Sequence, residues 1–271
     1  MNSLIQRTLT GAAFVVVLLG ALYWSSYSTV ALMGIFAALG LYEFYHLAAK
    51  QPNTQLEIGK SVVGGLALYA LFTFIFFGKV NPIYLIFILP LLFLFFVNEL
   101  YKVGRLPLNN VSIVAMGWLY VALPFYLIVE IRDFYPAQSL MYVFGLFILV
   151  WSNDTFAYLT GKFFGKTKLF ERISPNKTWE GTIGGIVFTF VAALLIVFLA
   201  PADLLFWLIS ALIISLAAIF GDLFQSMLKR SVNVKDSGSI LPGHGGILDR
   251  FDAMLFAAPF FYAWMVLYYN F

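Results

Sequence analysis

The chain has 271 residues, of which 62% are hydrophobic and only 11% are charged. About 25% of the residues of a soluble domain are charged, so this composition excludes a soluble globular protein and indicates a polytopic membrane protein. The absence of cysteine excludes disulfides and thiolate metal sites, and a net charge of +3 is too small to indicate nucleic-acid binding.

Mostly apolar runs follow one another along the chain. A helix needs about 20 such residues to cross a bilayer. The runs predict an all-α, multi-pass fold with about nine transmembrane helices, at residues 8–24, 29–48, 61–77, 81–97, 111–130, 139–160, 181–200, 203–221 and 251–269. Arg7 precedes the first run as in a signal peptide, but no convincing small-x-small cleavage site follows, so we predict a span.

The basic residues predict the orientation. Of the 16 Lys and Arg, only Lys79 and Arg132 fall outside the N-terminal tail and the loops after the second, fourth, sixth and eighth spans. The positive-inside rule therefore predicts a cytoplasmic N-terminus and a C-terminus on the other side. We expect a multi-pass protein of the cytoplasmic (inner) membrane. No soluble domain or internal repeat is evident, so we expect one membrane domain over 1–271, with its motif-bearing part at about 150–252.

Few polar residues interrupt the spans. Asp154 lies inside the sixth run, beside Asn153, and an acid at that depth is a candidate functional residue. Glu43 and His46 lie three residues apart near the end of the second run. They could form a proton relay, or a snorkelling or capping pair at the interface, and the position favours the second.

The segment 161–181 carries two motif-like stretches. GKFFGKT at 161–167 resembles a phosphate-binding loop but has the wrong glycine spacing and follows an apolar span. ISPNKTWEG at 173–181 places Ser174 before Pro175, which predicts that the seventh helix begins there. A helix N-terminus suits a phosphate, to which Lys177 and Thr178 could add an ammonium and a hydroxyl. Gly181 and Gly185 are spaced for close helix packing.

Charge, glycine and histidine gather in the stretch 226–252. If the eighth helix continues past Gly221, Asp222, Ser226 and Lys229 share one face, with Arg230 beside them. The chain then breaks into SGSILPGHGG and re-enters the membrane with Asp249 and Asp252.

Carboxylates without cysteine suit Mg²⁺ completed by substrate phosphates, which nearby Lys and Arg also suit. The stretch therefore indicates metal-assisted phosphoryl or nucleotidyl transfer at the cytoplasmic face. The alternative is ordinary positive-inside charge with a glycine-rich turn, which predicts no acids in the cluster.

The same stretch resembles the signature of the phosphatidate cytidylyltransferases (CDP-diacylglycerol synthases). That signature is Ser-x-x-Lys-Arg, then Lys-Asp, then Pro-x-His-Gly-Gly-x-x-Asp-Arg-x-Asp. It occurs here without a departure in spacing at Ser226, Lys229, Arg230, Lys235, Asp236, Pro242, His244, Gly245, Gly246, Asp249, Arg250 and Asp252. Asp154 and ISPNKTWEG also match the family in order and position, whereas the first five spans match only in general character.

The resemblance implies transfer of CMP from CTP to phosphatidic acid, giving CDP-diacylglycerol and pyrophosphate, with Mg²⁺ and K⁺ as cofactors. It implies a homodimer in the lipid bilayer and no nucleic-acid partner. Asp222 and Asp249 are the implied metal ligands. The implied catalytic residues are these two with Lys229, Lys235, Asp236, His244 and Arg250, with His244 as an orienting group rather than a base. The implied substrate-binding residues are Asp154, Ser174, Asn176, Lys177, Thr178, Ser226, Arg230, Gly245, Gly246 and Asp252.

Two other functions stay open. A CTP-dependent polyprenol or lipid kinase would share a membrane CTP site but release CDP rather than pyrophosphate. An ion-coupled transporter would use the intramembrane acids for ions or protons, but it predicts inverted repeats and paired broken helices, and neither is evident in the sequence.

Overall fold

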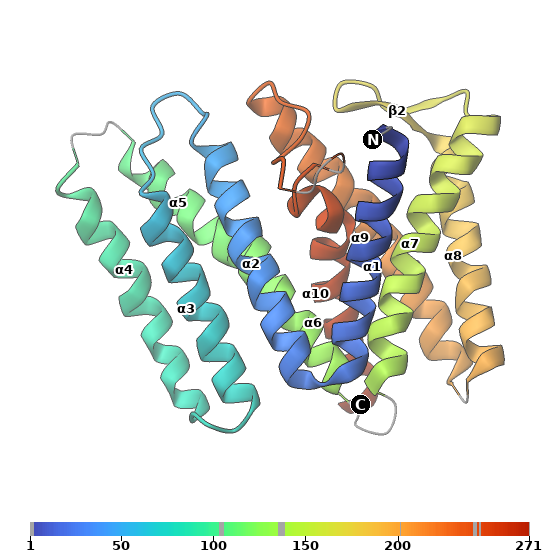
Figure 1. Cartoon of the computed structure of the whole chain (residues 1–271), viewed down its shortest axis with the longest axis horizontal. Coiled ribbons are helices and arrows are strands. Elements are labelled where there is room, and N and C mark those ends of the chain that lie inside the picture. The colour runs from blue at the N-terminus through green and yellow to red at the C-terminus, as the bar shows by residue number, and fades with distance from the viewer. Residues whose placement is uncertain are drawn as a thin grey trace. The chain divides into compact units, whose positions relative to one another are not determined.

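The computed structural model of the chain describes residues 3–102, 106–134, 139–200, 202–240, 243 and 245–270. Helices make up nearly all of the regular structure in these residues, and a single short hairpin is the only sheet there (Figure 1). In chain order the elements are α1 (Ser3–Trp24), α2 (Ser26–Ala48), α3 (Ile58–Phe76), η1 (Pro82–Phe87), α4 (Ile88–Glu99), α5 (Pro107–Gly117), η2 (Trp118–Ala122), α6 (Leu123–Asp133), α7 (Ser139–Phe164), β1 (Lys168–Phe170), β2 (Ser174–Thr178), α8 (Trp179–Leu199), α9 (Leu204–Ser231) and α10 (Leu248–Asn270).

The helices confirm an all-α, polytopic membrane protein. Within the part of the chain that the structure describes, eight helical segments are long and apolar enough to cross a bilayer by length and composition. The stretch Thr8–Trp24 is a further, shorter apolar helix, which matches the first predicted span. The spans Pro82–Glu99 and Pro107–Asp133 each combine a regular α-helix with a short 3₁₀ or π segment.

The chain divides into two compact units. The first contains Met1–Glu130 and Ser231–Arg250, and the second contains Ile131–Arg230 and Phe251–Phe271. The expectation of one membrane domain stays a prediction. Most of the substrate-binding residues predicted from the sequence fall in the second unit, whereas the segment from Lys235 to Arg250 falls in the first.

In the first unit, α2 packs against α3 and η2. Gly65 on α3 lacks a side chain where Leu41 and Trp118 press against the helix. The buried Tyr45 hydroxyl donates a hydrogen bond of 2.9 Å to the Val114 carbonyl oxygen. Buried hydroxyls need such partners, and this one fixes α2 against α5.

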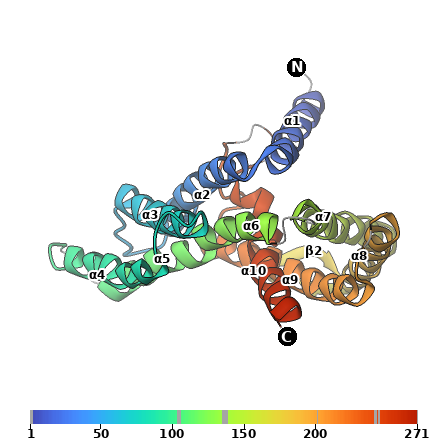
Figure 2. The same ribbon diagram turned by 90° about the horizontal axis from the view of Figure 1, so that it is seen from below.

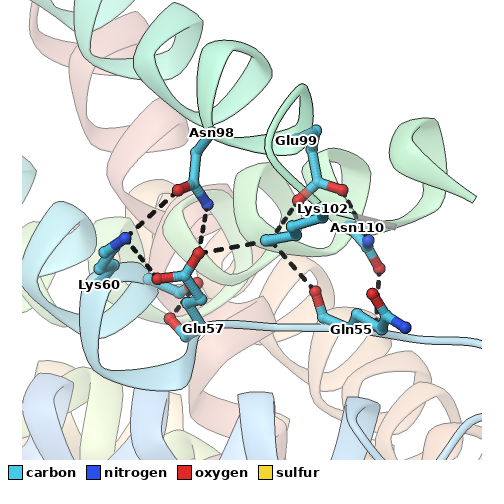
Figure 3. Close-up of polar contacts among 8 residues, drawn as sticks. Gln55, Glu57, Lys60, Asn98, Glu99, Lys102 and Asn110 are labelled. Carbon is cyan, nitrogen blue, oxygen red and sulfur yellow. Dashed lines mark hydrogen bonds and ion pairs between the residues drawn. The ribbon is translucent and has the colours of Figure 1, made fainter. Parts of the chain in front are cut away.

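A polar network joins α3, α4 and α5 at one end of the first unit (Figure 3). Glu57 forms an ion pair of 2.5 Å with Lys60 and accepts a 2.6 Å hydrogen bond from Asn98. The hydrogen bond from Lys60 is the largest cause that lowers the pKa of the Glu57 carboxyl, followed by the one from Asn98. Asn110 donates to Glu99 at 2.8 Å. These bonds connect the end of α4 to the start of α3 and to α5. They matter for the position of α4, because that helix buries none of its own residues.

In the second unit, α7 and α8 lie side by side in both views (Figure 1 and Figure 2). Glycines on α8 face α7 at the points of closest approach. A methyl group on Gly181 would lie 2.7 Å from the Ala157 carbonyl oxygen, and one on Gly185 would lie 2.9 Å from the Asn153 carbonyl oxygen. The predicted packing role of both glycines is confirmed.

Replacing Gly185 by alanine is expected to destabilise the protein by about 1–3 kcal/mol through overpacking. The clash is with backbone, which cannot rotate away. Thermal unfolding in detergent measures the effect, with Gly20→Ala as the matched helix-interior control, because nothing lies within 4 Å of a methyl group there. A Gly185→Ala protein as stable as Gly20→Ala would contradict the close packing.

The predicted start of the seventh transmembrane helix at Ser174 is wrong. Ser174–Thr178 forms β2, which pairs antiparallel with β1. The helix α8 begins only at Trp179, and its N-cap is Thr178, whose hydroxyl oxygen accepts a 3.2 Å hydrogen bond from the Gly181 N–H. The residue before a proline is biased toward extended backbone, so Ser-Pro fits a strand as well as a helix start.

Candidate active site

A cavity of about 520 Å³ opens within the second unit. It is lined by α7, β2, the first turn of α8, two residues of α9 and one residue of α10. Six residues predicted to bind substrate or metal line it: Asp154, Asn176, Lys177, Thr178, Asp222 and Asp252. Residues separated by up to about a hundred positions thus meet in one place, as expected of a preformed ligand-binding pocket.

Asp222 and Lys177 form the charged centre of the cavity. Lys177 Nζ lies 2.5 Å from Asp222 Oδ2, and both side chains are partly exposed. The Ser226 hydroxyl donates to Asp222 Oδ1 at 3.3 Å. Because α9 runs unbroken to Ser231, Asp222 and Ser226 share one face, as their spacing predicts. Both carboxylate oxygens therefore have a partner from the chain.

Asp252 reaches the same cavity because α9 and α10 pack closely. A methyl group on Gly221 would lie 2.7 Å from the Asp252 carbonyl oxygen, so only glycine allows this approach. Asp222, next to Gly221, is thereby brought near Asp252. The cavity then carries three carboxylates, including Asp154, against the two ammonium groups of Lys162 and Lys177. An added cation would offset the repulsion among these neighbouring acids.

Asn153 also lines the cavity, although it was not predicted from the sequence as a site residue. Its side chain is 2% exposed, and its Oδ1 has no hydrogen-bond partner among the residues that the structure describes. A buried acceptor left unpaired costs about 1–3 kcal/mol, and this oxygen lies against α8, where a methyl group on Gly185 would be 2.9 Å away. The only signal in the sequence is its place beside Asp154 within an apolar span.

The backbone N–H groups of the turn after α7 already have a carboxylate as their partner. The Lys166 N–H and the Thr167 N–H each donate to the Glu180 carboxylate at 3.1 Å. This agrees with the rejection of GKFFGKT as a phosphate-binding loop. The Glu180 contacts instead secure the connection between α7 and α8.

Some of the predicted residues lie away from the cavity lining. Ser174 lies at the start of β2, and Lys229 and Arg230 lie in the last turn of α9. None of these three residues lines the cavity. In the first unit, the side chains of Lys235, Asp236 and Arg250 are exposed. Pro242 and His244 lie outside the described residues.

Asp249 organises the segment that precedes α10 in the first unit. Its Oδ2 accepts hydrogen bonds from the Ser237 N–H at 2.8 Å and the Gly246 N–H at 3.0 Å. Gly245 has φ of +79°, a conformation that suits glycine, and a methyl group there would lie 2.7 Å from the same oxygen. The segment is thus folded tightly around this carboxylate.

Glu43 holds the same segment from α2. Glu43 does not snorkel to the interface with His46, because it is only 3% exposed; it serves as a cap instead, accepting from the Ile247 N–H at 3.0 Å and the Leu248 N–H at 2.9 Å. His46 contacts the Tyr42 carbonyl oxygen at 3.2 Å instead. In the sequence, Glu43 stands out as a lone acid within an apolar run. Its partners lie some 200 positions later and are backbone N–H groups, which leave no sequence pattern that could have predicted the contact.

The donor set suits magnesium by its chemistry. Among the described residues, no group of three His, Cys, Asp or Glu side chains could hold a metal ion by itself. Mg²⁺ commonly binds only one or two carboxylates and takes its other ligands from water and substrate phosphates. Asp222 fits such a role. Its pairing with Asp249 stays a prediction, because the two acids belong to different units.

Comparison with known proteins places these residues in context. The sequence model of the cytidylyltransferase family matches residues 5–268. A phosphatidate cytidylyltransferase of Bacillus subtilis (strain 168) is 43% identical over 162 residues, which cover 59% of this chain and 60% of the relative. Another, of Staphylococcus aureus (strain COL), is 42% identical over 158 residues, which cover 58% and 59%. The aligned part therefore spans about three fifths of the length of these curated relatives.

Proposed function

The chain belongs to the cytidylyltransferase family, and we propose that it transfers CMP from CTP to phosphatidic acid, releasing pyrophosphate and forming CDP-diacylglycerol. The single observation that carries the proposal is the cavity in which Lys177 and Asp222 form an ion pair and which two further acids, Asp154 and Asp252, also line. The relatives named phosphatidate cytidylyltransferase support the choice of substrates.

The proposed reaction needs little proton transfer. A phosphate oxygen of phosphatidic acid, already an anion, attacks the α-phosphorus of CTP. A new P–O bond forms, and the bond from the α-phosphorus to the bridging oxygen breaks, so that its electron pair leaves with pyrophosphate. Alignment and charge stabilisation therefore provide most of the catalysis, and no general base is required.

The cavity residues supply binding and orientation. Lys177 exchanges its contact with Asp222 for a substrate phosphate, and Lys162 adds a second ammonium group at the cavity wall. Thr178, which is buried at the N-cap of α8, fixes the backbone that carries Lys177. Asp222 would hold Mg²⁺, with Asp249 as its proposed partner and K⁺ as a further ion. The metal would supply positive charge beside the phosphates.

The setting suits a lipid substrate. Phosphatidic acid keeps its acyl chains in the bilayer while its headgroup meets soluble CTP, so the polar cavity must open near the membrane surface. We place the protein in the cytoplasmic (inner) membrane with a cytoplasmic N-terminus, which the charge pattern of the loops and the bacterial relatives support. We also propose a homodimer, and cross-linking in native membranes tests it.

Labelled CTP distinguishes the proposal from the lipid-kinase alternative. Purified protein is incubated with phosphatidic acid and Mg²⁺, and with CTP labelled at either the α- or the γ-phosphate. Cytidylyl transfer moves the α-label into the lipid phase and leaves the γ-label in aqueous pyrophosphate. A kinase would instead move a γ-label into a polyprenol supplied in place of phosphatidic acid. An α-label that stays wholly aqueous would overturn the proposal.

A further inference from the structure

Glu43 is a buried acid that the proposed reaction does not use. It lies near the end of α2, and its carboxylate contacts a segment some 200 positions later in the chain. Oε1 accepts from the Ile247 N–H and Oε2 from the Leu248 N–H, at 3.0 and 2.9 Å, and the Ser237 hydroxyl lies 3.4 Å from Oε2. A buried charge is stable only with such partners.

These contacts form an N-cap supplied from another helix. Leu248 is the first residue of α10, and the first N–H groups of a helix have no partner within it. A carboxylate at this end also meets the positive end of the helix dipole. Each oxygen of the carboxylate accepts from one of the two adjacent N–H groups, so both oxygens are used at this helix start.

The segment is shaped to receive this carboxylate. A methyl group on Gly238 would lie 2.5 Å from Glu43 Oε1, and one on Gly246 would also clash with the carboxylate. Both glycines therefore leave the space that Glu43 fills. Asp249 binds the Ser237 N–H and the Gly246 N–H of the same segment. The two acids hold residues 237–249 from two sides.

We infer that Glu43 is a positioning residue for catalysis, which fixes residues 237–249 by their backbone and so sets the orientation of Asp249 and Arg250 at the start of α10. The inference rests on the proposed function, because it takes these two residues to serve CMP transfer. Glu43 itself contacts backbone and the Ser237 hydroxyl and acts only through the segment that it holds.

Glu43→Gln tests the inference by two independent measurements. Glutamine keeps one acceptor oxygen but turns an NH₂ group toward a backbone N–H, so one of the two bonds is lost. Hydrogen exchange followed by mass spectrometry is expected to show at least about tenfold faster exchange in a peptide spanning 245–249 and no change elsewhere. Turnover is expected to fall about 10- to 100-fold, since small misplacements have effects of that size.

Glu57→Gln is the matched control, because it makes the same chemical change in the first unit within the network of Figure 3. It is expected to leave both exchange at 245–249 and turnover within about twofold of wild type, as for surface changes away from a site. Faster exchange throughout the Glu43→Gln protein, with turnover falling only in proportion to folded protein, would reduce Glu43 to a general stabilising role and overturn the inference.

Gly238→Ala provides a second route that leaves Glu43 in place. The added methyl displaces the carboxylate from its two N–H donors and is expected to reproduce the local exchange change and the lower turnover. Gly59→Ala is its control, since nothing lies within 4 Å of a methyl group there. Wild-type protein that fails to transfer CMP overturns the proposed function. Active wild type with an unaltered Gly238→Ala protein overturns only the inference.

Discussion

Asp222→Asn is expected to lower CMP transfer by roughly 10³-fold, the size of effect seen when one electrostatic group of an active site is removed. Asn is isosteric but carries no charge, so the variant loses the partner of Lys177 and the carboxylate that would bind a cation. Turnover of the purified variant measures the change, recovery from the membrane fraction shows that it inserts, and size-exclusion chromatography in detergent shows whether it still folds.

Glu171→Gln is the control for this change. Glu171 is an exposed acid in the turn between β1 and β2 of the same unit, and it does not line the cavity. Its turnover is expected to stay within about twofold of wild type, as for surface changes. Full turnover by the well-folded Asp222→Asn protein would contradict the assignment of this acid to the reaction. Asp249→Asn is predicted to lose activity as well.

Local patterns were enough to predict the membrane architecture. Each span is a run of apolar residues, and a helix satisfies its own backbone inside a bilayer, so the run alone specifies the element. The face shared by Asp222 and Ser226 follows from helical spacing in the same way, and the structure confirms it. The glycines of α8 were also predicted correctly, because close helix packing needs small residues at regular spacing.

Contacts between distant segments could not be predicted from such patterns. Ser174 was placed at a helix start, because Ser-Pro fits either a helix cap or an extended strand, and only pairing with β1 decides between them. Glu43 was placed at the interface because its partners, the N–H groups of Ile247 and Leu248, carry no side-chain signal. Asn153 shows its importance only through burial without a partner.

Lys177→Met is the second change for which we expect a large effect. The ammonium group is the cation nearest to Asp222 and the candidate first contact for a CTP phosphate. A hydrogen bond to a charged group is worth about 1.5–3 kcal/mol, so kcat/KM for CTP is expected to fall about 10- to 150-fold. Steady-state kinetics with CTP varied at saturating phosphatidic acid measures it. Lys177→Arg keeps the charge but not the compact geometry, and an intermediate loss is expected.

Lys166→Met is the matched control for Lys177→Met, because the Lys166 side chain is exposed and lies outside the cavity lining, only its backbone N–H being used by Glu180. The double variant Asp222→Asn with Lys177→Met separates two roles of the lysine. If Lys177 acts with Asp222 in one charged unit, the double variant is no slower than Asp222→Asn alone, because residues in contact couple. Fully additive losses would show that Lys177 binds phosphate independently of Asp222.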